Sequence, residues 1–137
     1  MRKKITAVAA GVAALSAVAL GVGASPAAAS PGGCVWGTDA CLFYHSNESG
    51  GFNGDGGNDN YGAAWYFEGC SGGNCDGDGQ QVYNNIGYVY NESYRTVTIF
   101  ALYNCNYNGP NLTIGPTTGQ TLYGSGVYNH DASQCFS

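Results

Sequence analysis

Residues 96–103 read Thr-Val-Thr-Ile-Phe-Ala-Leu-Tyr, and this stretch has the clearest strand pattern in the chain. β-Branched and aromatic side chains of this kind favour strands over helices. Successive side chains of a strand point to opposite faces, and here both faces would carry apolar groups. The stretch therefore predicts a central strand that is covered on both sides.

The sequence around this strand is rich in glycine and asparagine, which are poor in helix interiors and good in turns. Short apolar segments bounded by such turn residues are typical of a sandwich of antiparallel sheets. We therefore predict an all-β single domain. Two Gly-rich acidic stretches, Gly50–Asn60 and Cys70–Gly79, are expected to be surface loops. The predicted strands are Cys41–Tyr44, Ala63–Phe67, Gln81–Tyr83, Gly87–Tyr90, Thr96–Tyr103, Asn111–Ile114, Thr121–Tyr123 and Gly126–Tyr128.

The chain contains six cysteines, an even number that in a short exported protein indicates three disulfides. Many pairings are possible from the sequence alone, but proximity along the chain favours Cys34–Cys41 and Cys70–Cys75, which leaves Cys105–Cys135. A zinc site is the alternative interpretation. It would need CxxC-type spacing or ligating histidines, whereas the close pairs here have the spacings C-x6-C and C-x4-C.

The amino-terminal segment has the order of a secretory signal peptide. Residues 2–4 are Arg-Lys-Lys, residues 5–24 form an uncharged apolar run, and residues 27–29 are three alanines. The sequence predicts a cleaved signal over 1–29 and a domain over 30–137 that works outside the cell. A membrane anchor is the alternative, but the cleavage pattern that follows the run favours removal.

Charge restricts the partners of the predicted domain. Once the signal is removed, Arg95 is the one remaining Lys or Arg residue against nine carboxylates, which gives a net charge of −8. Nucleic acids and anionic membrane surfaces need positive charge on the protein. We therefore expect no nucleic-acid partner, no membrane contact after cleavage, and a monomer.

A weak internal repeat links two parts of the predicted domain. Tyr44 precedes Gly50 by the spacing Y-x5-G, and Tyr103 precedes Gly109 by the same spacing, 59 residues later. We interpret each as a folded hairpin in which glycine takes a backbone angle that a Cβ would forbid. Tyr107 stands where an aromatic ring could cover the second hairpin.

These motifs carry a resemblance to a known family. The stretch Tyr103–Gly109 resembles the Greek-key signature of βγ-crystallin domains. The wider layout, from Cys34–Tyr44 through Val97–Tyr103 to Asn129–Ser133, is similar to secreted actinobacterial proteins grouped as peptidase inhibitor family I36, whose type member inhibits thermolysin-like metalloproteases. The resemblance implies a βγ-crystallin-like Greek-key sandwich that inhibits an extracellular metalloprotease and is not an enzyme.

The same resemblance raises the question of calcium, which some βγ-crystallin domains bind through an [N/D]-[N/D]-x-x-[S/T]-S stretch in each half. Hard cations need several oxygen ligands at close range. The matching positions here depart from that pattern in both halves, and turn formation is the alternative role of these side chains. Otherwise no cofactor is expected. The candidate calcium residues are Asn84, Asn85, Asn129, Asp131 and Ser133.

The short ring that a Cys70–Cys75 disulfide would close is the candidate reactive loop of an inhibitor. It contains Ser71, Gly72, Gly73 and Asn74. Rigidity in such a loop favours affinity, but these residues offer no large apolar side chain to a thermolysin-like protease. A stapled surface loop is the alternative, with the reactive segment elsewhere, for instance at 65–67.

The aromatic content suggests a second function. Eleven tyrosines and two tryptophans exceed what a core of this size needs, so some rings should be exposed. Exposed rings among amides suit contact with sugars, because rings stack on apolar faces while amides bond hydroxyl groups. Half-buried strand positions are the alternative place for these tyrosines. Binding of an extracellular polysaccharide or cell wall is therefore the alternative to inhibition.

Overall fold

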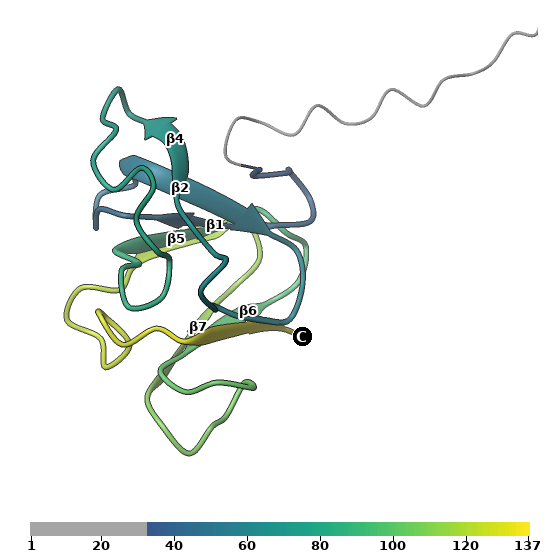
Figure 1. Cartoon of the computed structure of the whole chain (residues 1–137). Helices are drawn as coiled ribbons and strands as arrows, with labels where there is room; N and C mark the ends of the chain where they lie inside the picture. Colours follow the sequence, from purple (N-terminus) through teal and green to yellow (C-terminus); the bar gives the residue numbers. More distant parts are fainter. Residues whose placement is uncertain (1–32) are drawn as a thin grey trace, which may run out of the picture.

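The computed structural model describes residues 33–137, which form two antiparallel β-sheets (Figure 1). The predicted all-β fold is confirmed, and no helix in this range is long and apolar enough to cross a membrane. The expected signal peptide, 1–29, lies outside the described residues. The strands are β1 (Ala40–Phe43), β2 (Gly50–Asp55), β3 (Asp59–Asn60), β4 (Glu68–Ser71), β5 (Tyr88–Asn91), β6 (Val97–Phe100), β7 (Asn111–Ile114), β8 (Thr118–Thr121) and β9 (Ser133–Phe136).

The two sheets pack face to face around one core. One sheet has the strand order β4-β2-β1-β5-β8 and the other has β3-β9-β6-β7. Figure 1 shows β2, β1 and β5 in one layer and β6 and β7 in the other. Leu42 and Val89 of the first sheet and Ile99 and Ile114 of the second are buried in the same apolar cluster. This burial between the layers is the main favourable contribution to folding.

The strand order divides the domain into two halves, β1-β2-β3-β5 and β6-β7-β8-β9, with β4 added at one edge. In each half the fourth strand returns to lie beside the first, as β5 does beside β1 and β9 beside β6. The third strand leaves its own half, because β3 pairs with β9 and β8 pairs with β5. The halves therefore exchange one strand each.

Backbone hydrogen bonds define which residues of the two halves correspond. The Gly87 N–H donates to the Phe43 carbonyl at 2.8 Å, and the Ala132 N–H donates to the Phe100 carbonyl at the same distance. Phe43 thus corresponds to Phe100, and Gly87 to Ala132. Counting from these pairs aligns the hairpins that follow β1 and β6, and the loops that precede β5 and β9.

This correspondence corrects half of the repeat predicted from the sequence. The Tyr44 N–H donates to the Gly51 carbonyl, whereas the Ala101 N–H donates to the Pro110 carbonyl. Tyr44 therefore corresponds to Ala101, and its predicted equivalence to Tyr103 is wrong. The second hairpin is two residues longer than the first, which moved the matching tyrosine out of register.

The two glycines of the predicted repeat do correspond, but they are needed for different reasons. Gly50 has a φ of 88°, a left-handed angle that glycine adopts without strain. A Cβ at Gly109 would lie 2.8 Å from the side chain of Leu102. The first glycine therefore permits a backbone angle, and the second permits close packing.

The prediction of a surface loop over Gly50–Asn60 is wrong, because β2 and β3 occupy most of it. Glycine usually weakens a strand, but it is used where another backbone approaches closely. Gly54 is such a position, since a Cβ there would overlap the backbone of Gly33 and Cys34. The glycines that suggested a loop are therefore packing residues of a strand.

The other strand predictions gave mixed results. The central strand is confirmed, since β6 lies between β9 and β7 and all four of its residues are buried, but it ends at Phe100, three residues before the predicted end at Tyr103. The segments β1, β5 and β7 lie within one residue of their predicted bounds, and β8 begins three residues earlier than predicted. Strands were wrongly predicted at Ala63–Phe67, Gln81–Tyr83 and Gly126–Tyr128, and β4 and β9 were missed.

All three predicted disulfides are present: Cys34–Cys41, Cys70–Cys75 and Cys105–Cys135. The first two close short loops, and the third joins the hairpin after β6 to the last strand across 30 positions of the chain. Three disulfides in a small all-β domain are compatible with an extracellular protein.

Candidate functional site

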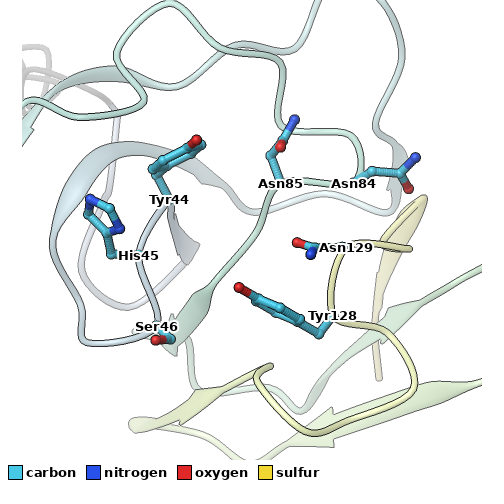
Figure 2. A pocket seen from close by; sticks show the side chains of 7 residues that line it. All are labelled: Tyr44, His45, Ser46, Asn84, Asn85, Tyr128 and Asn129. Atoms are coloured by element: carbon cyan, nitrogen blue, oxygen red, sulfur yellow. The ribbon is translucent and has the colours of Figure 1, made fainter.

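A pocket of about 600 Å³ opens where the first hairpin meets the loops that precede β5 and β9 (Figure 2). Both halves of the domain contribute to it. Its size falls within the range of small-ligand sites, although its lining is more polar than is usual for them. The lining residues are Tyr44, His45, Ser46, Asn84, Asn85, Tyr128 and Asn129.

Tyr44 forms one wall of the pocket and is held from behind. Its ring packs edge-to-face against Phe67, with centroids 5.8 Å apart. It also lies on Gly77, where a Cβ would overlap the ring and where φ is 87°. Phe67 is fully buried. The wall is therefore placed by the core rather than by the hairpin alone.

Tyr128 lines the pocket from the loop before β9, and Figure 2 shows its ring beside Asn129. The residue before it, Val127, is fully buried and fixes the loop to the core. One neighbour of the Tyr128 ring is Tyr123, which packs edge-to-face at 5.4 Å and is itself 71% exposed. Tyr128 is half-buried, so part of its ring faces the pocket.

Asn84 and Asn129 occupy corresponding positions in the two halves and have left-handed backbone angles, with φ of 61° and 57°. Asparagine is the non-glycine residue that tolerates this region best. The Asn85 N–H donates to the Val82 carbonyl, and the His130 N–H donates to the carbonyl of Val127 in the same way, both at 3.0 Å. These matched turns place Asn84 and Asn129 in the lining of the same pocket.

Several polar side chains of the lining lack a partner within residues 33–137. His45 lies 3.4 Å from Asp76, and the Asn85 amide nitrogen donates to two backbone carbonyls, which leaves its oxygen free to accept. Unpaired polar groups in a recess are available to a ligand or to water. The side chains without a hydrogen-bond partner in this range are Tyr44, Ser46, Asn84, Tyr128 and Asn129.

Asp131 lies behind the pocket and holds its loops together. One of its carboxylate oxygens accepts the Ile86 N–H at 3.2 Å, and its backbone carbonyl accepts the Asn84 N–H at 3.0 Å. Burial raises the pKa of this carboxyl to about 7. The other carboxylate oxygen is buried without a partner among the described residues. Asp131 thus ties the loop before β5 to the loop before β9.

The five candidate calcium residues come from two loops that are far apart along the chain, and they serve different roles. Asn84, Asn85 and Asn129 line the pocket, whereas Asp131 and Ser133 are buried. The Ser133 hydroxyl already donates to the Leu102 carbonyl at 2.7 Å and accepts the Cys105 N–H. Within residues 33–137 no group of three or more His, Cys, Asp or Glu side chains is placed to hold a metal ion. Calcium binding stays a prediction.

The candidate reactive ring is a tight turn. The Asn74 N–H donates to the Ser71 carbonyl, and Gly72 and Gly73 both have left-handed angles, φ 62° and 74°. The Ser71 hydroxyl donates to the carbonyl of Glu48 in the first hairpin at 3.2 Å. The ring is exposed at its glycines, but its backbone is folded rather than extended.

Comparisons of the chain with protein families, with curated proteins and with solved structures found no match.

Sequence reasoning missed four residues of the lining: Tyr44, His45, Ser46 and Tyr128. A signal for Tyr128 was present. The triplet Val-Tyr-Asn occurs at 82–84, 89–91 and 127–129, and the first and last copies stand at the corresponding turns of the two halves. The predicted repeat used the hairpins, whose lengths differ, and so passed over the more regular one.

Proposed function

We propose that this protein is an extracellular saccharide-binding module and that the pocket is its binding site. The observation that carries the proposal is the set of unpaired amide and hydroxyl side chains around the two tyrosine walls. Sugars present hydroxyl groups to amides and apolar ring faces to aromatic side chains. The pocket offers both kinds of contact at once.

The charge of the domain supports a neutral or amino sugar as the ligand. Arg95 is the one Lys or Arg residue in 33–137, and His45 of the pocket lies against Asp76. Carboxylated, sulfated or phosphorylated sugars would meet a like-charged surface without a cation to pair with, which disfavours them. The three disulfides and the signal-like residues 1–29 support secretion.

The strand order supports the proposed βγ-crystallin-like fold. Such domains consist of two Greek keys, in each of which the last strand returns beside the first. Here β5 returns beside β1, and β9 beside β6. The corresponding hydrogen bonds at Gly87 and Ala132 support a common origin of the two halves.

Binding to insoluble glycans tests the proposed function. We expect the folded, disulfide-intact protein to be retained by at least one of chitin, cellulose and peptidoglycan. Asn129→Gly should reduce retention, because glycine keeps the left-handed angle while the amide is lost. Thr117→Gly is a matched control, since Thr117 also has a left-handed φ, 52°, and lies outside the pocket. Absence of retention on all three glycans would contradict the proposal.

Inhibition of a thermolysin-like metalloprotease is the second candidate, and the exposed, cross-linked ring between Cys70 and Cys75 is the feature that favours it. The left-handed angles of Gly72 and Gly73 weigh against a substrate-like fit, because a bound substrate segment is extended. Residual protease activity with a micromolar excess of the protein tests this candidate. Full activity would remove it.

A further inference from the structure

The corresponding positions of the two halves differ at one side chain beside the pocket. Ser46 is the third residue after Phe43, and Tyr103 is the third residue after Phe100. Tyr83 stands four residues before Gly87, whose N–H donates to the Phe43 carbonyl. Tyr128 stands four residues before Ala132, whose N–H donates to the Phe100 carbonyl. Ser46 facing Tyr128 is therefore the counterpart of Tyr103 facing Tyr83.

In the second arrangement the space is filled by a ring. Tyr103 stacks on Tyr83 with centroids 5.6 Å apart and planes 8° from parallel. In the first arrangement a serine takes the position of the stacking ring, and the pocket lies beside it. The turns that carry Tyr128 and Tyr83 have the same backbone hydrogen bonds, so the open space over Tyr128 corresponds to the space that the Tyr103 ring fills over Tyr83.

We infer that the ligand supplies this ring: one neutral pyranose unit stacks on Tyr128 as Tyr103 stacks on Tyr83. This inference rests on the proposed function and specifies its ligand. Asn84 and Asn129 stand at corresponding turns of the two halves. Neither amide has a hydrogen-bond partner among residues 33–137, so both are free to bond hydroxyl groups at the edge of the sugar.

The polar rim distinguishes a sugar ring from an aromatic side chain. A phenyl ring over Tyr128 could not bond the amides of Asn84 and Asn129, and a phenol has a single hydroxyl group to offer them, whereas a buried unpaired amide is costly. A pyranose has one apolar face for the tyrosine and hydroxyl groups around its edge for the amides. The pocket therefore favours the sugar.

Ser46→Tyr tests the inference directly, because it places a ring over Tyr128 as Tyr103 lies over Tyr83. We would titrate the labelled full domain, followed by NMR, with glucose, N-acetylglucosamine, galactose and mannose, and with p-cresol as the aromatic probe. For the wild type we expect a dissociation constant of about 1 mM for at least one sugar. Shifts should centre on Tyr128, Asn84 and Asn129. Ser46→Tyr should abolish these shifts while its melting temperature is unchanged or raised.

Two further variants serve as controls. Asn47→Tyr places the same ring on the next, exposed residue of the hairpin, outside the pocket, and should leave binding unchanged. Tyr128→Ala, which removes the platform without filling the space, should weaken binding about tenfold.

The outcomes separate this inference from the proposed function. If the wild type is retained by a glycan and binds a sugar, and Ser46→Tyr binds it equally well, the ring-replacement inference is overturned while saccharide binding stands. If Asn129→Gly loses binding and Ser46→Tyr does not, the ligand occupies the pocket without stacking on Tyr128, and the inference is again overturned. Binding of p-cresol with no response to any sugar overturns both.

Discussion

The two halves of this domain share a backbone plan but differ in what they leave open. At the second hairpin Tyr103 stacks on Tyr83, and no pocket forms between the rings. At the first hairpin Ser46 stands at the corresponding position, and a pocket of about 600 Å³ opens beside Tyr128. The turns that carry Tyr83 and Tyr128 match, so the closed surface and the recess differ in the hairpin that faces each tyrosine, by its side chain and by its length.

The halves differ again one layer deeper. Ile86 of the first half corresponds to Asp131 of the second, and the carboxylate of one accepts the backbone N–H of the other. The second hairpin is further fixed by the Cys105–Cys135 disulfide, whereas the first is held by packing of Tyr44 and by the contact of Ser71 with Glu48. The second hairpin is thus held by a covalent bond, and the first depends on packing and hydrogen bonding.

The largest expected effect comes from removing the disulfide that fixes the second hairpin. Replacing Cys105 and Cys135 together by serine should lower the free energy of unfolding by about 3–4 kcal/mol on the chain-entropy account of a 30-residue loop. Replacing Cys70 and Cys75 should cost about 2 kcal/mol, because the loop is shorter. Urea unfolding of both variants measures the difference. Equal losses would show that loop length does not set the order.

A smaller effect is expected from the buried carboxylate that joins the halves. Burial raises the pKa of Asp131 to about 7, above its value in the unfolded chain, so folding takes up a proton between about pH 4 and pH 7. The stability contributed by this group is complete in acid and is lost as the pH rises through 7. We expect the free energy of unfolding to be about 3 kcal/mol lower at pH 8 than at pH 5.

Asp131→Asn should remove most of this dependence, since the amide oxygen can still accept the Ile86 N–H without a charge. Burial also raises the pKa of Asp55 and Glu92, so a residual dependence of the same sign should stay in the variant. Urea unfolding at both pH values measures the slope. An unchanged slope in the variant would assign the effect to other carboxyls.

The smallest expected effect comes from removing the ring that covers Tyr83. Tyr103→Ser should cost about 1 kcal/mol, the contribution of one aromatic stack, and should expose the Tyr83 ring. Tyr103→Phe keeps the ring and is the matched control, so it should unfold like the wild type. Binding at the pocket of the first half should be unaffected. If Tyr103→Ser is as stable as the wild type, the stack does not hold the surface closed.

Much of the fold could be predicted because local signals agreed. Residues 96–103 indicated a buried central strand, and short separations along the chain indicated two of the disulfides. The signal failed at Gly50–Asn60, where glycine is required by the approach of Gly33 and Cys34, segments that the sequence cannot place beside it. The amino-acid type indicates a residue's own conformational preference, but it does not indicate which residues pack beside it in the folded chain.

The pocket was harder to predict for the same reason. Asn84, Asn85 and Asn129 were identified as candidates for calcium, and the structure brings these amides together, but beside the tyrosine walls. The vacancy over Tyr128 depends on Ser46, more than eighty positions away, and on comparison with a second pair of residues in the folded chain. The correspondence between Ser46 and Tyr103 can be recognised only from the backbone hydrogen bonds of the folded chain.

The exchange of β3 and β8 between the halves bears on how fast the chain can fold and open. Each sheet is complete only when a strand from the opposite half joins it, as where Asp59 of β3 pairs with Gln134 of β9. Such distant pairings form slowly, since the chain entropy is lost before the contacts are gained. The same interlocking means that neither half can detach while the other stays intact. Where proteases attack transiently opened states, a slow, all-or-none opening of this kind lengthens the lifetime of the folded protein.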